Sequence, residues 1–327
     1  MKRILYIGLM LAALLATSCA DKKGSEVHFR RFEKILFETP ADQLQAELKR
    51  HQEEYNTELI LLYPDEPGYI EMAQSYASDP TMREVYRITD SLYHDLSDIE
   101  QDLSHAMERA RKLYPSMQLP SRFFTMVTGD FDNYPYRVYS NMSDLGVSID
   151  QYALSSMGKY QYFGIPSHIV RLCSRQYIVA DCMNCIASLN CSSLDDKRTG
   201  EATLLDHAIA EGKVIYFLEK TLPHTHDTIL MRYTKEQMDW MKKNTANVWS
   251  WLLQNRMLYN TDLSLFRNLI DDAPKTNAFG DGSAPRTVSY IGWQIVRAYM
   301  KKGGATMQQL FEETDSQKIL NQSGWRP

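Results

Sequence analysis

Residues 123–128 of this chain, with the sequence FFTMVT, decide the fold class because they interrupt a helical pattern in a sequence of 327 residues. Aromatic and β-branched residues dominate the stretch, which is typical of a β-strand. Residues 136–140 (YRVYS) and 146–154 (GVSIDQYAL) have a similar character and follow turn-forming segments. We therefore expect three short strands in hairpin succession, forming a small antiparallel sheet.

Helical signals lie on both sides of these strands. Before them, Pro40 and Pro80 open stretches with apolar residues three or four apart, and Ser97 with Glu100 forms a capping-box pattern for a helix that ends at Pro115. After them, helices are expected over residues 178–187, 203–219, 288–300 and from Thr234 onward, with two short last helices capped by Thr306 and Asp315. Helices, a small sheet and helices again indicate an α+β fold that is mostly helical.

The N-terminus has the pattern of an exported lipoprotein. Lys2 and Arg3 precede an apolar run over residues 4–16, and residues 15–19 (LATSC) resemble a bacterial lipobox. The alternative is an ordinary secretory signal with a chance cysteine. We predict a lipoprotein signal peptide at residues 1–18, lipidation of Cys19, a short tether at residues 19–26 and a single domain over residues 27–327.

Charge and hydropathy limit the partners. Loss of Lys2 and Arg3 with the signal peptide removes two positive charges and takes the net charge from −5 to −7. An acidic chain without a basic stripe argues against nucleic acid as a partner. No later segment has the length of apolar residues that a membrane span needs. We therefore expect an extracytoplasmic protein held to the cell membrane or outer membrane by its acyl chains.

The eight histidines do not form a known zinc motif. Neither H-E-x-x-H nor H-x-x-E-H occurs, and both supply metal ligands and a base from one helix. The nearest remnant is His207 with Glu211, which share a helix face four residues apart. This pair is either half of a metal site or a surface pair on a helix. The sequence therefore predicts no metal and no other cofactor.

Four cysteines fall within nineteen residues, at Cys173, Cys182, Cys185 and Cys191. Outside the cytoplasm, structural disulfides are the favoured interpretation, and sequence alone does not choose among the three possible pairings. Free thiols and a metal site that uses the C-x-x-C of Cys182 and Cys185 are the alternatives.

Several motifs together resemble a known family. They are residues 204–207 (LLDH), 211–218 (EGKVIYFL), 233–237 (YTKEQ), 289–297 (SYIGWQIVR) and 323–327 (SGWRP). Their order and spacing resemble the gliding motility lipoprotein GldB family of Bacteroidetes, over roughly residues 27–327. The resemblance implies a zincin-like fold and a role in gliding or in the type IX secretion machinery.

The same resemblance implies where a catalytic site would lie. Relatives with peptidase activity carry H-E-x-x-H on the helix before the E-G segment, which here is the helix over residues 178–187. Asp181, Cys182 and Cys185 stand there instead, and only Glu211 matches a glutamate of the relatives. The cysteine cluster departs from the family pattern.

These observations favour a non-catalytic envelope lipoprotein that acts through contacts with other envelope proteins. The alternatives are a zinc-dependent hydrolase with an atypical site near Glu211 and His207, and an envelope lipoprotein that binds a small ligand. A hydrolase would need a metal or a polar cluster converging on Glu211, whereas a ligand-binding protein would need a sizeable closed pocket.

Overall fold

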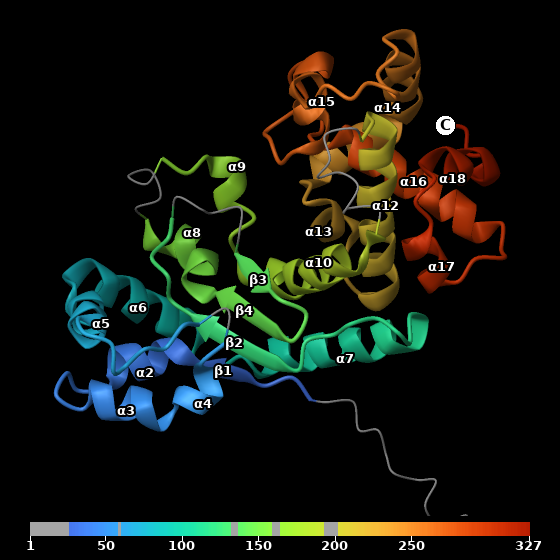
Figure 1. Ribbon diagram of the computed structural model, residues 1–327. Coiled ribbons are helices and arrows are strands. Elements are labelled where there is room, and N and C mark those ends of the chain that lie inside the picture. The colour runs from blue at the N-terminus through green and yellow to red at the C-terminus, as the bar shows by residue number, and fades with distance from the viewer. Residues whose placement is uncertain (1–25, 58–59, 132–136, 159–163, 193–201) are drawn as a thin grey trace, which may run out of the picture.

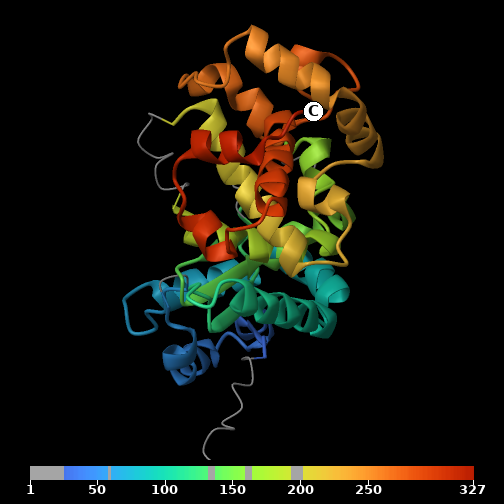
Figure 2. The ribbon, with the colours of Figure 1, turned by 90° about the vertical axis from the view of Figure 1, so that its right-hand side faces the viewer.

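The computed structural model describes residues 26–57, 60–131, 137–158, 164–192 and 202–327. In Figures 1 and 2 the N-terminal helices lie at the bottom of the view and the C-terminal helices at the top. One large apolar cluster includes residues from Val27 to Ile319 and joins the two parts. The expected α+β class, mostly helical with a small sheet, is confirmed.

The first half of the chain supplies six helices and the four strands among the described residues. In chain order these elements are β1 (Phe29–Arg31), α2 (Phe32–Glu38), α3 (Leu44–Arg50), α4 (Gln52–Tyr55), α5 (Tyr69–Ser78), α6 (Pro80–Tyr93), α7 (Ser97–Leu113), β2 (Arg122–Met126), β3 (Val138–Ser140) and β4 (Asp144–Ser148).

The rest of the described chain is helical. Its elements are η1 (Ile149–Ala153), α8 (Leu154–Met157), α9 (Ser167–Val170), η3 (Arg175–Tyr177), α10 (Ile178–Asn190), α12 (Leu204–Thr221), α13 (Asp227–Met231), α14 (Lys235–Gln254), α15 (Leu263–Ile270), η5 (Asn277–Phe279), α16 (Thr287–Lys301), α17 (Met307–Glu312) and α18 (Ser316–Ser323).

The sheet is mixed, so the prediction of an antiparallel sheet was wrong. Its strand order is β1-β2-β4-β3, with β1 and β4 both parallel to β2 and only β3 antiparallel to β4. Phe123 on β2 pairs with Leu145 on β4, and every residue of β4 is buried, as is common for parallel strands covered on both faces. The chain leaves β2, crosses to the edge as β3 and returns as β4, which makes β2 and β4 parallel. The three-residue strand β1 was not foreseen.

Two local details also differ from the expectation. The third predicted strand ends at Ser148, because the buried carboxylate of Asp150 accepts hydrogen bonds from the backbone nitrogens of Thr128 and Gly129 and the chain turns into η1. The capping box at Ser97 is not formed. Glu100 instead accepts a 2.7 Å hydrogen bond from the backbone nitrogen of Phe29, which ties β1 to α7.

Helices α12 and α16 pack with their backbones in contact. A Cβ atom on Gly292 would lie 1.7 Å from the carbonyl oxygen of Ala208, and one on Gly212 would lie 2.3 Å from the carbonyl carbon of Gly292. Glycine is required at such a close approach because any side chain would collide with backbone. This contact places Glu211 on α12 beside the start of α16, where Arg286 lies.

The described helices were also compared with the dimensions of a membrane. Within the described ranges, none of them combines the length and the apolar character that crossing a bilayer requires.

Candidate functional site

Helix α10 presents a buried carboxylate. Asp181 is 7% exposed, and its Oδ2 accepts hydrogen bonds from the Tyr152 hydroxyl at 2.7 Å and from Arg137 Nη2 at 3.0 Å. Its Oδ1 accepts a 2.7 Å hydrogen bond from Arg232 Nη2. Both oxygens of Asp181 are therefore held by donors from distant parts of the chain.

The pairing continues from Arg232 to helix α12. Arg232 Nη1 donates a 2.7 Å hydrogen bond to Asp272, whose second oxygen lies 3.8 Å from Arg286 Nε. Arg286 Nη2 in turn donates a 3.0 Å hydrogen bond to Glu211. We define the arginine–carboxylate network as the three guanidiniums and three carboxylates of Arg137, Asp181, Arg232, Asp272, Arg286 and Glu211.

Two of the arginines occupy a strained backbone conformation. Arg232, at the C-cap of α13, has a φ of 59°, and Arg286, at the N-cap of α16, has a φ of 47°. A left-handed residue other than glycine costs about 1 kcal/mol or more. Glycine at either position would remove this strain but would also remove the guanidinium. The arginine at each position is therefore consistent with a stabilising contribution from its ion pairs.

Asp181 and Asp272 of the network are ionised at neutral pH. Burial raises the pKa of Asp181, but Arg232 and Arg137 outweigh burial and hold it below its usual value. Burial likewise opposes ionisation of Asp272, and Arg232 with Arg286 lowers its pKa to about 2. The network brings together three guanidiniums and three carboxyl groups, so its cationic and acidic groups are equal in number.

The metal candidates His207 and Glu211 both lie on α12, as the sequence predicted. The side chain of Glu211 is 30% exposed and points to Arg286, while His207 is partly exposed one turn earlier. Among the described residues, no group of three or more histidine, cysteine, aspartate or glutamate side chains has a geometry that could hold a metal. Glu211 therefore takes part in an ion pair.

Cys173, Cys182 and Cys185 carry thiols in the structure, and the disulfides that the sequence favours stay a prediction. Cys173 and Cys182 are buried, and Cys173 accepts a 3.8 Å hydrogen bond from Arg137. Cys185 lines a pocket of about 350 Å³ beside Asp181. Burial, with a smaller contribution from Asp181, raises its pKa to about 11, so it is a poor nucleophile at neutral pH. The lipidation candidate Cys19 lies outside the described residues.

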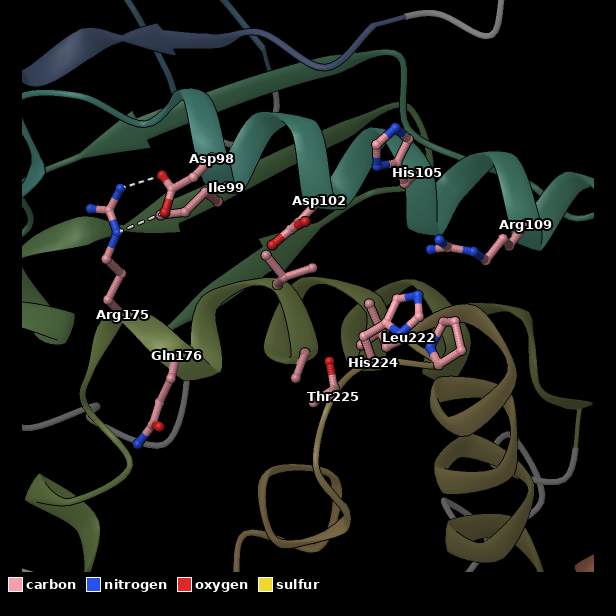
Figure 3. Close-up of a pocket in the computed structure, with 13 residues that line it drawn as sticks. Asp98, Ile99, Asp102, His105, Arg109, Arg175, Gln176, Leu222, His224 and Thr225 are labelled. Carbon is pink, nitrogen blue, oxygen red and sulfur yellow. Dashed lines mark hydrogen bonds and ion pairs between the residues drawn. The ribbon is translucent and has the colours of Figure 1, made fainter.

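A separate groove of about 490 Å³ opens between α7 and the segments packed against it (Figure 3). Helix α7 contributes side chains that recur three or four residues apart, which places them on one helix face. The lining residues are Asp98, Ile99, Asp102, His105 and Arg109 from α7, Arg175 and Gln176 from η3, Val179 and Ala180 from α10, and Leu222, Pro223, His224 and Thr225 after α12.

The floor of the groove is apolar and its walls are charged. Ile99, Ala180 and Leu222 are buried at its base. Arg175 pairs with Asp98 across the groove, with Nε 3.2 Å from Oδ2. His224, interpreted from the sequence as part of an exposed turn, is indeed exposed and lines the same groove. The groove therefore joins the two halves of the chain and is accessible to a ligand from solvent.

Sequence reasoning missed most of these residues. The network arginines are 14 to 75 positions from their carboxylate partners in the chain, so no local pattern marks them. The charged face of α7 did carry a signal. Asp98, Asp102, His105 and Arg109 repeat with the same period as the apolar stripe that identified the helix.

Comparison with known proteins gives one match. A family model described as gliding motility protein GldB matches residues 17–327, which is nearly the whole chain. No curated protein and no solved structure matches the chain significantly. The zincin-like relationship therefore stays a prediction from the resemblance.

Proposed function

The chain belongs to the gliding motility protein GldB family, and on that basis we propose that it is a non-catalytic cell-envelope lipoprotein that acts through contacts with other proteins. The pairing of Asp181 and Glu211 with arginines carries the non-catalytic part of the proposal. A zinc hydrolase needs open ligand positions and a base that can accept a proton from the metal-bound water. Carboxylates that are held by guanidiniums serve poorly in either role.

The N-terminal sequence and the family support the envelope location that we propose. The proposal places acyl chains on Cys19, which would hold the domain at the cell membrane or outer membrane, outside the cytoplasm. Its partners would be envelope proteins of the gliding or type IX secretion machinery. An exposed groove with charged walls supports recognition of a protein segment better than a closed small-molecule pocket would.

Metal content and hydrolysis test the non-catalytic part. We expect elemental analysis of the purified full chain to find no stoichiometric zinc, and we expect added zinc to produce no peptidase activity. One zinc per chain, together with peptide hydrolysis, would instead support a zinc hydrolase that uses His207 and Glu211.

Acyl labelling tests the anchor. Cells grown with an alkyne-bearing fatty acid should label the wild-type protein and should not label Cys19→Ala. Cys185→Ala is a matched control, because it removes a partly exposed cysteine from the domain and leaves the signal sequence intact. A Cys19→Ala protein that is still labelled and processed normally would refute the anchor.

Crosslinking in intact cells tests the protein contacts. We expect mass spectrometry to identify envelope proteins joined to the wild-type chain, and we expect the yield to fall for Cys19→Ala, which loses its place at the membrane. Recovery of the chain without any crosslinked envelope protein would contradict the proposal.

A further inference from the structure

The groove beside α7 carries two separated charged groups that form no ion pair within the described part of the chain. Asp98 at one end is neutralised by Arg175. Asp102, one turn further along, is exposed, and within the described part of the chain its carboxylate has no hydrogen-bond or ion-pair partner. An exposed carboxylate of this kind is solvated, so it can receive a cation without breaking an existing pair.

Arg109 provides the opposite charge further along the same face. Its Nη1 donates a 3.1 Å hydrogen bond to the carbonyl oxygen of Thr221, and no carboxylate in the described ranges forms an ion pair with it. Seven residues separate Asp102 from Arg109, which corresponds to about 10.5 Å along a helix that rises 1.5 Å per residue. The groove therefore presents a negative group and a positive group from backbone positions about 10 Å apart along α7.

Much of the groove lining is apolar, and His105 lies between the two charged residues on α7 (Figure 3). Ile99, Val179 and Leu222 line the groove with Ala180, and its volume of about 490 Å³ lies within the usual range for a binding site. An apolar base with charged groups towards each end matches a polypeptide segment, in which charged side chains flank smaller apolar ones. A free amino acid does not match, because its opposite charges lie within one residue of each other.

We propose that this groove binds a polypeptide segment in the polyproline II conformation, whose basic side chain reaches Asp102 and whose acidic side chain, three residues away, reaches Arg109. Polyproline II has three residues per turn and rises about 3.1 Å per residue, so side chains three residues apart lie on one face about 9 Å from each other, close to the rise of α7 between Asp102 and Arg109. This inference rests on the proposed function, because it specifies the protein contact that the lipoprotein would make.

Short peptides test the charge pattern directly. The probe is the peptide Lys-Leu-Ala-Glu, acetylated and amidated so that only its side chains are charged. Calorimetric titration of the detergent-solubilised full chain should give tighter binding for this peptide than for Lys-Leu-Ala-Lys, Glu-Leu-Ala-Glu or Gln-Leu-Ala-Gln. Equal affinity for all four peptides, or no binding of any, would overturn the proposal.

Matched variants locate the binding to the groove. Asp102→Asn and Gln101→Lys each raise the net charge by one unit, but Gln101 lies outside the residues that line the groove. We expect Asp102→Asn to weaken binding of Lys-Leu-Ala-Glu about fivefold, as for loss of an exposed ion pair, and Gln101→Lys to leave it unchanged. Arg109→Gln should weaken binding similarly, with Lys112→Gln as its control. If a groove variant and its control weaken peptide binding equally, the assignment of the binding site to the groove is overturned.

The same titration separates this inference from the proposed function. Mass spectrometry of the peptide after each titration should find it intact. If no peptide binds, the peptide stays intact and the protein contains no zinc, the proposed binding by the groove is overturned and the non-catalytic proposal stands. A cleaved peptide would overturn the non-catalytic proposal, and the initial cleavage rates of the four peptides would then support or overturn the charge preference.

Discussion

In the arginine–carboxylate network each carboxylate contacts at least one guanidinium, whereas in the groove the carboxylate of Asp102 faces solvent with no cation beside it in the described chain. The two regions use the same kinds of side chain in opposite surroundings. A buried charge is costly unless it is paired, so the network can persist only as a closed set. An exposed charge is stabilised by water and needs no partner. The paired charges of the network therefore stabilise the fold, whereas the unpaired carboxylate of the groove is open to a ligand.

Removing one carboxylate from each region gives the strongest test of this difference. Asp181→Asn leaves Arg137 and Arg232 partly without a counter-charge in a buried site, so we expect the free energy of unfolding to fall by about 3 to 5 kcal/mol. Asp102→Asn should leave the denaturation midpoint unchanged. Urea denaturation followed by circular dichroism measures both, and equal loss of stability in the two variants would contradict the distinction.

The next largest effect concerns the helix pair that brings Glu211 to Arg286. A methyl group at Gly292 would collide with the backbone of Ala208, so Gly292→Ala must push α16 away from α12. We expect a loss of about 3 kcal/mol or more.

Gly68→Ala is the control for this substitution. Gly68 has a φ of +80° but no atom lies within 4 Å of an added Cβ, so only the backbone strain of about 1 kcal/mol applies. Unfolding free energies that fall equally in Gly292→Ala and Gly68→Ala would show that the close packing contributes nothing.

Acid should weaken the network when its paired carboxylates become protonated. The pKa of Asp272 is about 2 in the folded state, below its unfolded value of about 4. A lowered folded pKa means that the stabilisation is fully present above about pH 4 and is lost as the pH falls towards 2. We expect Asp272 to contribute about 2 kcal/mol of that loss.

The adjacent Asp271 supplies the control for the acid experiment. Its side chain is half exposed and pairs with Arg267 on the surface. Asp272→Asn should lower stability at pH 7 and flatten the dependence between pH 4 and pH 2, whereas Asp271→Asn should leave that dependence as in the wild type. Parallel curves for all three proteins would exclude Asp272 as a source of the acid sensitivity.

Local patterns predicted most of the helices. The expected helices over residues 178–187, 203–219 and 288–300 correspond to Ile178–Asn190, Leu204–Thr221 and Thr287–Lys301, and the capping box at Thr234 is confirmed. These features depend on neighbours within one or two turns. Strand direction depends instead on how distant segments meet, which explains why the sheet was predicted with the wrong pairing.

The candidate site shows the same division between local and distant information. The groove face of α7 repeats within one helix, so Asp102 and Arg109 could have been aligned from the sequence. Their opposite wall could not, because Leu222 and His224 lie more than a hundred residues away. The network could not be predicted at all, since its arginines come from loops and helix ends that no periodicity marks.

The smallest expected effect separates a structural glutamate from a catalytic one. Glu211→Gln keeps the shape of the side chain, and Arg286 retains Asp272 and a hydrogen bond to the carbonyl oxygen of Met231. Because Glu211 is partly exposed, we expect a loss of only about 1 kcal/mol in the free energy of unfolding. Glu219→Gln, two turns along α12, is a matched control that also removes a charge from an arginine partner, Arg297. If both variants restore the function of a deletion strain, the role of Glu211 is structural and consists of its ion pair with Arg286. Loss of function in Glu211→Gln alone, at unchanged stability, would mean that the carboxylate has a chemical role and would favour the hydrolase.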